Sequence, residues 1–540
     1  MTGQAGESVK TDERVSSIIG NAAEFRLLVD RARRHLSDNK VGRAAEDLQQ
    51  AASFAWFNHP GFFADPEFEG LLAKIGLRLP ANRNRRSRKS FGGKRVVLHV
   101  ATQLYPTGGH TQMLGRWLLD DSGSNHRVVT VRQGSTPLPE KVTHMLSERP
   151  LQLDRLANTL LDRASSLRQQ AQEADFVIVH AHPDDVVPAI ALAGQATPCI
   201  YVNHADHVFW AGSSVATLLL HLRYSGAELS VARRAVSQER SFLMNRPLAP
   251  AAKGLSRTCE RERLSIQAGQ IVLVTAASAT KYVPIDDPGL LPLLEAAVLA
   301  DPRLVVLAAG PSPIGDWALA SAHTGGRITA LGPLQSVQGL FAAADIYVDS
   351  YPFSSLTSLL EAGSHGLPCV SFRGHSEECA VLGADSPHVE RDISYPHTKE
   401  AFLATIRQLG DDPGVRREQG DQLRTAIQMS HGHSWGSNLE NLYARAHKAA
   451  SHRPEGLEAA VSVGPLDVAV AALQERTGYA LGAVGAQRSV LSVMSPWRRL
   501  AAWLQIRRAG IRVRPAELLS DGHRIRFEET VVSVRRLMST

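Results

Sequence analysis

The chain has 540 residues, a length typical of about two to four domains. Hydrophobic residues make up 44% and charged residues 21%, which is ordinary for a soluble globular protein. No run of about 18 apolar residues occurs and the first residues are polar, so we expect neither a membrane-spanning helix nor a secretory signal, and a cytoplasmic location. No paired spacing typical of zinc or of disulfides is found among Cys199, Cys259, Cys369 and Cys379.

The positive charge, +6 in total, is concentrated in two segments. Residues 81–95 carry seven Lys or Arg and no acid, and residues 487–540 carry eleven Arg against four acids, which leaves −8 on the remainder. Such segments fit contact with the phosphates of a membrane surface or of a polyanionic acceptor. We interpret residues 81–93 as a basic linker, and we expect no nucleic acid partner.

Residues 1–80 are predicted to form a helical accessory module. Apolar residues recur near a period of 3.6 in residues 23–36 and 41–55, and a third run covers residues 68–75. Asn58-His59-Pro60-Gly61 breaks the pattern between the last two. The module either docks a partner or packs onto the next domain.

From residue 94 short apolar strands alternate with helical stretches. The runs at 96–100, 128–131, 176–179 and 199–202 are nearly continuous, which predicts a doubly wound parallel sheet in a domain of residues 94–255. The first strand leads into Pro106-Thr107-Gly108-Gly109-His110. Because ligands bind beyond the carboxyl ends of such strands, Gly108 and Gly109 would let backbone amides approach a phosphate or a sugar closely.

Two histidine clusters follow the last two of these strands. They are His180-Ala181-His182-Pro183 and Asn203-His204-Ala205-Asp206-His207, at strand ends where active-site loops belong. No established metal-ligand spacing is present, so we expect no metal. We interpret the residues of the clusters, among them His204 and Asp206, as groups that bind a sugar or transfer a proton. His180, His204 and His207 can equally be structural histidines bonded to loop carbonyls.

A second Rossmann-like domain is predicted for residues 256–450. Its strands are the runs at 271–274, 304–307, 328–331, 346–348 and 369–370. Lys281 follows the first of them, and a lysine that leaves a strand end can place its ammonium on a departing diphosphate. A surface lysine is the other interpretation.

The stretch 349–372, DSYPFSSLTSLLEAGSHGLPCVSF, contains a strand end, a polar loop and a helix start. Ser354 or Ser355 is predicted to cap the helix, and the hydroxyls of Thr357 and Ser358 lie in its first turn, where the dipole and unpaired amides favour a diphosphate. Glu361, one turn further, is placed to accept both hydroxyls of a ribose. The pattern indicates a nucleotide-sugar pocket, although an ordinary strand, loop and helix would also explain it.

The order of these motifs over residues 94–450 resembles GT-B glycosyltransferases. It is similar to the retaining family with a Glu, seven residues, Glu motif and to the O-GlcNAc transferase family. Glu361 matches the second glutamate, Thr357-Ser358 match the paired hydroxyls, and Phe353 stands where the first glutamate would be. The resemblance implies two Rossmann-like domains facing across a cleft and metal-independent, retaining transfer of a hexose or N-acetylhexosamine. The donor would be a nucleotide sugar, with a UDP-sugar favoured, and no cofactor would be needed.

The resemblance also implies roles for single residues. His182 holds the position whose imidazole contacts the transferred sugar, and His110 is placed to approach acceptor or donor. Lys281 matches a lysine of both families and is expected to act in catalysis and in donor binding. The complete donor site implied in this way comprises Gly108, Gly109, Lys281, Thr357, Ser358 and Glu361.

Residues 451–540 form a basic, partly helical appendix that this fold does not explain. Trp497, Leu500, Ala501 and Leu504 make one helical stripe with arginines on its flanks. A basic helix of this kind can lie on an anionic membrane surface or pack against the body of the protein.

Two other classes of function stay open. A GT-B epimerase or hydrolase would use the same donor pocket without an acceptor, and a non-catalytic scaffold would bind a polyanion through the basic segments. The sequence names neither the sugar and base of the donor nor the acceptor, which is a glycan, a lipid-linked glycan or a protein.

Overall fold

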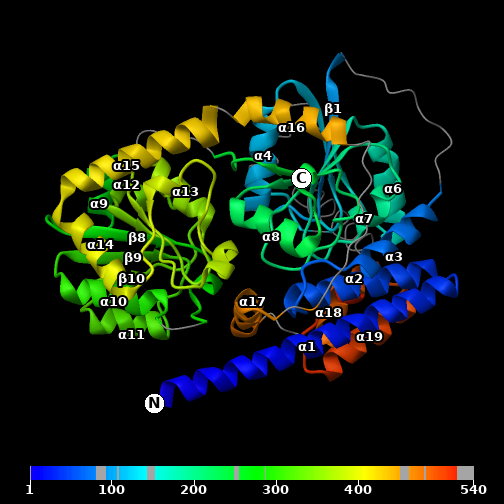
Figure 1. Cartoon of the computed structure of the whole chain (residues 1–540), viewed down its shortest axis with the longest axis horizontal. Coiled ribbons are helices and arrows are strands. Elements are labelled where there is room, and N and C mark those ends of the chain that lie inside the picture. The colour runs from blue at the N-terminus through cyan, green and yellow to red at the C-terminus, as the bar shows by residue number, and fades with distance from the viewer. Residues whose placement is uncertain are drawn as a thin grey trace, which may run out of the picture. The chain divides into compact units, whose positions relative to one another are not determined.

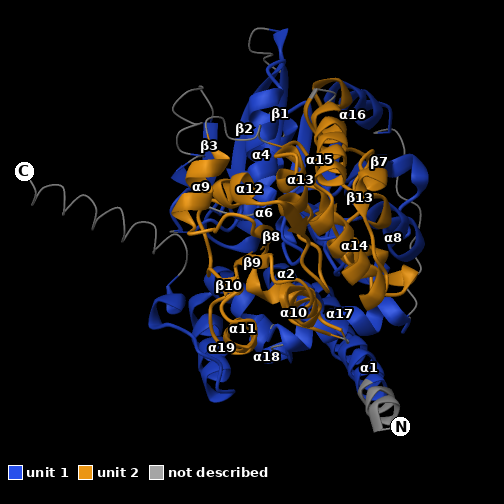
Figure 2. Cartoon of the chain, turned by 90° about the vertical axis from the view of Figure 1, so that its left-hand side faces the viewer, with its two compact units in different colours: residues 1–221, 226–242, 439–540 blue, residues 222–225, 243–438 orange. Residues whose placement is uncertain are grey.

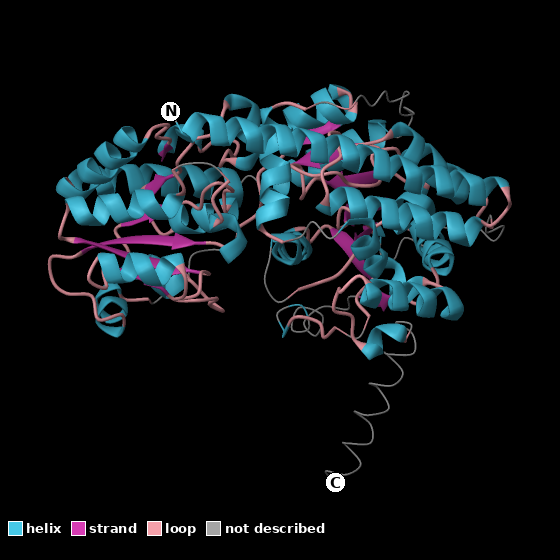
Figure 3. Ribbon diagram, turned by 90° about the horizontal axis from the view of Figure 1, so that it is seen from below, coloured by secondary structure: helices cyan, strands magenta, loops and turns pink. Residues whose placement is uncertain are grey.

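The structure is a computed structural model that describes residues 2–80, 93–105, 109–134, 136–140, 142, 152–248, 255–285, 288–433, 435–449, 461, 463–478 and 482–519. The chain divides into two compact units (Figure 2). Unit 1 comprises residues 1–221, 226–242 and 439–540, and unit 2 comprises residues 222–225 and 243–438. In each unit the strands lie between helices (Figure 3).

Unit 1 is built on a seven-stranded sheet with the order β3-β2-β1-β4-β5-β6-β7. Neighbouring strands from β3 to β6 pair in parallel. The four predicted strands are confirmed as β1 (Arg95–Ala101), β2 (Ser124–Thr130), β4 (Phe176–His180) and β5 (Cys199–Val202). The sequence did not predict β3 (Gln152–Arg155), β6 (Leu218–His221) and β7 (Ser241–Leu243).

Helices follow the strands of unit 1 in the manner of a doubly wound fold. They are α4 (Gly109–Asp120), α6 (Leu160–Gln172), α7 (Val187–Leu192) and α8 (Tyr224–Arg234). The last helix of the Rossmann-like region, α16 (Trp435–Ala449), begins in unit 2 and continues into unit 1. There Tyr443 accepts a hydrogen bond from the indole of Trp117 on α4 at 2.9 Å.

The first 80 residues form α1 (Thr2–Ser37), α2 (Val41–Phe57) and α3 (Pro66–Leu77), as the apolar periodicity predicted (Figure 1). These helices share one hydrophobic core with the sheet of unit 1, since Phe25 and Leu72 belong to the same cluster as Val100. The buried carboxylate of Glu69 on α3 accepts the backbone N–H of Gly212, at 2.7 Å, in a loop of the sheet domain. Of the two possibilities for this module, the structure shows packing onto the adjacent domain.

Unit 2 contains a six-stranded sheet with the order β10-β9-β8-β11-β12-β13, and all of its pairs are parallel. Both sheets therefore have the Rossmann strand order, counted along the chain as 3-2-1-4-5-6. The strands are β8 (Ile271–Ala276), β9 (Leu304–Ala309), β10 (Ile328–Ala330), β11 (Ile346–Val348), β12 (Cys369–Val370) and β13 (Ile393–Ser394). The helices are α9 (Arg257–Arg263), α10 (Leu290–Ala300), α11 (Asp316–His323), α12 (Gln338–Ala343), α13 (Leu356–Ser364), α14 (Lys399–Asp411) and α15 (Pro413–Ile427).

The described part of the C-terminal appendix contains α17 (Pro465–Arg476), α18 (Gly482–Ala486) and α19 (Pro496–Arg508) (Figure 1). α17 contacts α1 and α18 contacts α2, whereas α19 contacts the segment Gln487–Val493, which itself contacts α2. Trp503 and Ile506 of α19 join the core of unit 1. No helix of the described residues is long and apolar enough to cross a bilayer. The linker residues 81–92 lie outside the described residues.

Candidate functional site

Lys281 lies beside the loop that leads into α13. It follows β8 in a short helical turn, and its ammonium donates to the backbone carbonyl of Ser354 at 2.6 Å. The same nitrogen lies 4.4 Å from the centroid of the Phe353 ring. Because β8 and β11 are adjacent parallel strands, their carboxyl ends bring this lysine to the helix start that the sequence singled out.

The loop after β11 is organised by the buried carboxylate of Asp349. One oxygen accepts the N–H groups of Ser350 at 2.9 Å and Ser355 at 3.0 Å. The other accepts the hydroxyls of Ser354 at 2.6 Å and Ser371 at 3.3 Å. Burial raises the pKa of Asp349, although these hydrogen bonds and the charge of Lys281 act in the opposite direction.

The predicted side-chain cap of α13 is not formed. Ser355 occupies the cap position, but its side chain makes no capping hydrogen bond and its hydroxyl donates instead to the hydroxyl of Ser358 at 3.2 Å. The hydroxyl of Ser354, the other predicted cap, is directed to Asp349. A side-chain cap would need one of these hydroxyl oxygens to accept a backbone N–H of the first turn. Neither does so here, and the backbone N–H of Ser355 itself donates to Asp349.

Arg246 is a second cation at the start of α13, and sequence reasoning missed it. Its guanidinium donates to the hydroxyl of Thr357 at 2.5 Å, and its own carbonyl interacts with the ring of His431 at 2.7 Å. Nothing in the local sequence marks this arginine, which follows β7 and is more than a hundred residues from Thr357. Glu361 lies one turn after Thr357 at a partly buried position of the same helix.

Two glycine turns complete the carboxyl edge of this sheet. Gly310, after β9, has a φ of 115°, and a Cβ there would lie 1.7 Å from the carbonyl oxygen of Ala277. Its N–H donates to the carbonyl of Gly332, and the N–H of Gly332 donates to that of Pro311, both at 2.8 Å. Close approach of three loop backbones therefore requires glycine at position 310.

In unit 1 the structure brings together three of the histidines that the sequence singled out. The rings of His110 and His204 stack with centroids 3.9 Å apart, and His182 lies 5.9 Å from His110. Tyr105 stacks on His182 at 5.7 Å, and Trp56 of α2 lies 5.9 Å from it. The cluster lies at the carboxyl ends of β1, β4 and β5, so the strand-end argument located it correctly.

His182 is held in place through its backbone. Its N–H donates to the hydroxyl of Thr102 at 2.8 Å, and that hydroxyl donates to Asp185 at 2.6 Å. Burial, together with the nearby charge of Arg132, lowers the pKa of His182 to about 4. The imidazole is thus neutral at pH 7 and can accept or donate a hydrogen bond to an uncharged hydroxyl.

The other candidates of unit 1 lie apart from this group or within the sheet. Asp206 is only 4% exposed and contacts α8, where a Cβ at Gly226 would lie 2.6 Å from its carboxylate. His207 lies 3.5 Å from the same carboxylate. His180 is bonded to another imidazole rather than to a loop carbonyl, with its Nδ1 3.2 Å from Nε2 of His204. Gly109 begins α4, whereas Gly108 lies outside the described residues.

The arrangement offers anion binding in unit 2 and proton exchange in unit 1. Lys281, Arg246 and the hydroxyls at the start of α13 are suited to a diphosphate. Neutral imidazoles in unit 1 are suited to a hydroxyl substrate. Within the parts of the chain that the structure describes, no group of three or more His, Cys, Asp or Glu is arranged to hold a metal ion.

Comparison with known proteins shows the fold. No protein-family model matches the chain, and no curated protein matches it in sequence. A glycosyltransferase from Rickettsia africae ESF-5 matches with a TM-score of 0.53 and 12% identity, over 66% of this chain and 99% of that one. Alr3699/HepE from Anabaena, solved with UDP and glucose, matches with a TM-score of 0.51 and 14% identity, over 65% and 99%. With its two parallel Rossmann-like sheets, the chain therefore has the GT-B fold of these glycosyltransferases.

Proposed function

We propose that the protein is a glycosyltransferase that moves a sugar from a UDP-sugar to an acceptor hydroxyl, without a metal and with retention of the anomeric configuration. The observation that carries the proposal is the pair of cations at the start of α13, Lys281 and Arg246, within a GT-B fold. Oriented cations and backbone amides at that place favour a nucleoside diphosphate. The Anabaena protein of the same fold was solved with UDP-glucose.

The proposed donor site uses the residues that the sequence indicated. Thr357, Ser358 and Lys281 bind the diphosphate, and Glu361 binds the ribose. Arg246 joins them because it already holds the hydroxyl of Thr357. As the glycosidic bond breaks, negative charge grows on the leaving UDP, and fixed cations stabilise it most in the transition state.

The proposed acceptor side is the histidine cluster of unit 1. His182 contacts the transferred sugar, while His110 and His204 meet the acceptor. Asp206 supports His207 and the loop around it. The acceptor proton passes to a histidine or to the leaving phosphate.

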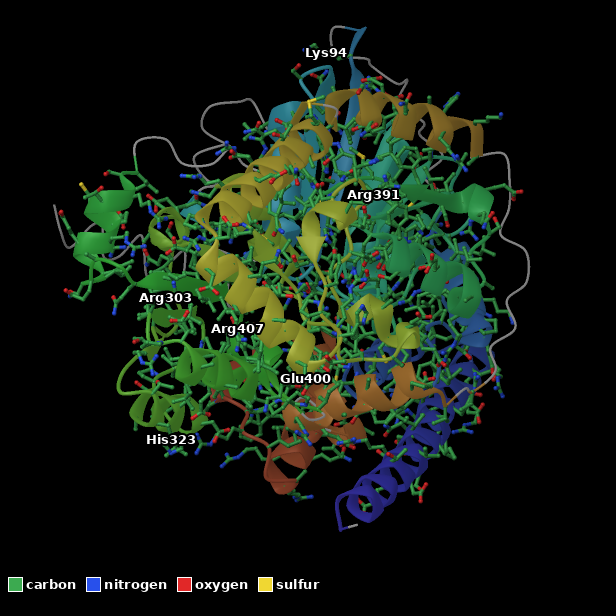
Figure 4. The ribbon with its side chains drawn as sticks, turned by 60° about the vertical axis from the view of Figure 1, so that its left-hand side comes forward. Lys94, Arg303, His323, Arg391, Glu400 and Arg407 are labelled. Carbon is green, nitrogen blue, oxygen red and sulfur yellow. The ribbon has the colours of Figure 1, made fainter. Side chains whose placement is uncertain are left out.

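A ligand-induced shift of thermal unfolding tests the donor site, because a ligand that binds only the native state raises its stability. UDP should raise the unfolding temperature more than GDP or ADP, and Lys281→Ala and Glu361→Ala should each abolish the rise. Matched controls are Arg407→Ala and Glu400→Ala, which remove exposed charges from α14 (Figure 4). A full UDP shift in both site variants would contradict the assignment.

Transfer itself is tested with a panel of UDP-sugars and the purified products. The proposal expects a new glycoside whose anomeric proton shows the configuration of the donor. Release of free sugar alone would favour a hydrolase, and an isomerised nucleotide sugar would favour an epimerase. Salt-dependent binding of polyanions with no nucleotide effect would favour the scaffold.

We also propose that the protein is a peripheral protein on the cytoplasmic face of the membrane. Its helix α19 would contact the anionic membrane surface. Trp497 is 83% exposed, and Leu500 and Leu504 are 39% and 41% exposed, so the apolar stripe faces outward rather than into the core. Arg507 and Arg508 are exposed on the same helix, and the segment from residue 487 carries a net charge of +7. An exposed Trp and Leu stripe with flanking arginines suits an anionic lipid headgroup layer.

A further inference from the structure

Four imidazoles form a continuous hydrogen-bonded series inside unit 1. Nδ1 of His180 lies 3.2 Å from Nε2 of His204, and Nδ1 of His99 lies 3.4 Å from Nε2 of His180. Nε2 of His99 lies 3.0 Å from Nδ1 of His126. Nε2 of His126 then lies 2.8 Å from the backbone carbonyl of Asp121. We call these four residues the imidazole series.

The imidazole series crosses the sheet diagonally, from its carboxyl edge toward its amino edge. His204 follows β5 and His180 ends β4, whereas His99 is in the middle of β1 and His126 is near the start of β2. In the register, Ala101 is opposite His180 and Val97 is opposite His126, so each step shifts two residues along the strands. The series therefore links the candidate acceptor site to a place near the other end of the strands.

With four neutral rings, the carbonyl at the inner end fixes the direction of every hydrogen bond. A carbonyl only accepts, so His126 must carry its proton on Nε2. Neutral His126 then accepts on Nδ1, which requires the proton of His99 to be on Nε2. The same step applied twice more places the protons of His180 and His204 on Nε2 and leaves the lone pair of His204 on Nδ1.

The surroundings keep the inner rings neutral. His99 and His180 are buried, and burial lowers the pKa of His180 to about 3 and that of His99 well below its ordinary value. Trp117 of α4 packs edge-on against both rings, at 5.6 and 5.9 Å between centroids. Neutral imidazoles in sequence, each donating and accepting once, are able to transfer a proton along their hydrogen bonds.

A carboxylate stands at the inner end of the series. Nε2 of His126 lies 3.7 Å from Oδ2 of Asp121, and that oxygen accepts the hydroxyl of Tyr443 at 2.7 Å. The guanidinium of Arg95 lies 4.5 Å from the centre of the Tyr443 ring. A doubly protonated His126 would therefore be stabilised by the carboxylate of Asp121, whereas a positive charge on His180 or His99 would have no such partner close by.

We propose that the imidazole series is a proton relay that fixes His204 in the Nε2–H form and carries the acceptor proton from His204 to His126, beside Asp121. This inference rests on the proposed function and assigns His99 and His126 as positioning residues. His110 stacks on the ring of His204, the first member of the series. Nδ1 of His204 is buried, so proton uptake requires the groups over it to move.

The proposed step moves one sugar and one proton. The acceptor O–H bond breaks, its electron pair forms the new bond to the anomeric carbon, and the pair of the old glycosidic bond leaves with the diphosphate. The proton binds Nδ1 of His204, and the Nε2 protons of His204, His180 and His99 each move to the next Nδ1. His126 is left doubly protonated. After the products leave, the reverse shift returns the proton to solvent.

Nitrogen NMR of the full chain labelled with ¹⁵N-histidine tests the tautomers without any turnover. Signals are assigned by single substitution of each histidine. The relay requires the Nε2–H pattern for all four rings at pH 7. A neutral His204 with its proton on Nδ1 would overturn the proposal, whether or not the protein transfers sugar.

Substitution His99→Phe, which keeps a flat ring but removes both nitrogens, tests the relay itself. We expect His204 to become a mixture of tautomers and turnover to fall about 10²-fold, the usual contribution of a general base, with an unchanged UDP-induced stability shift. The control is Leu98→Ala, a buried residue of the same strand whose side chain belongs to the other face. Equal turnover in the two variants would overturn the relay. If UDP does not raise the unfolding temperature of the wild type, the proposed function itself is contradicted.

Discussion

The ammonium of Lys281 lies 4.4 Å from the centre of the Phe353 ring, at the position where the retaining pattern has a glutamate. An aromatic face attracts a cation through its quadrupole, by about 0.5–2 kcal/mol. Phe353 therefore supplies an uncharged means of holding the lysine. Such a contact leaves the charge of Lys281 uncompensated, as the proposed diphosphate site requires.

Phe353→Leu should weaken UDP binding, because the lysine loses the ring that orients it. A loss of about 1 kcal/mol corresponds to roughly a five-fold rise in the dissociation constant, which isothermal titration calorimetry can resolve. Phe353→Tyr keeps the ring and is the control. Equal weakening in both variants would show that the aromatic contact is not the cause.

Asp349→Ala should cost about 2–4 kcal/mol of unfolding free energy, since four donors to the buried carboxylate lose their acceptor. Chemical denaturation measures this loss. Asp349→Asn should be much milder, because an amide oxygen can accept the two N–H groups while the amide nitrogen donates to the two serine hydroxyls.

The pH dependence of the Asp349 variants has a definite sign. Burial raises the folded-state pKa of Asp349 above its ordinary value of 3.8, so the native state holds this proton more tightly than the unfolded chain does. Stability contributed by this group is therefore greatest below pH 3.8 and declines as pH rises through the folded-state pKa. Asp349→Asn should remove this part of the decline when unfolding free energies are compared between pH 4 and pH 7. If the unfolding free energies of wild type and Asp349→Asn change in parallel between pH 4 and pH 7, this prediction is wrong.

Gly310→Ala should destabilise unit 2 by at least about 2 kcal/mol, because alanine meets both an unfavourable φ and the carbonyl of Ala277. Gly315→Ala is the matched control, since Gly315 also has a positive φ of 57° but no atom within 4 Å of an added Cβ. The difference between their unfolding temperatures isolates the contact. If the two variants are equally stable, the loops do not require glycine at position 310 for close approach.

Most of both sheets could be predicted from sequence because central parallel strands are buried on both faces and consist of continuous apolar residues. The strands that were missed are mainly edge strands without that signal. The polar β3, QLDR, and the short β13 lie at sheet edges, as does the three-residue β7. β6 is an apolar run, LLLH, of the short kind that periodicity cannot assign to strand or helix.

The candidate site was predictable where its chemistry follows a strand directly. Lys281 and the start of α13 meet because β8 pairs with β11, which the strand order of the fold dictates. Arg246 and His99 carried no local signature. The first depends on a contact across more than a hundred residues, and the second is a single histidine inside an apolar strand, VVLHVA.

Trp497→Ser with Leu500→Ser should reduce sedimentation with vesicles of anionic phospholipid. The two side chains form the exposed apolar stripe of α19, and their loss removes roughly 1.5–3 kcal/mol of potential burial each. Leu319→Ser, which removes a leucine 58% exposed on α11, is the control for a general loss of surface hydrophobicity. Binding should also weaken at high salt and be poor on neutral vesicles, because the arginines act through charge. If the double variant sediments like wild type, α19 does not contact the bilayer and its exposed stripe serves another partner.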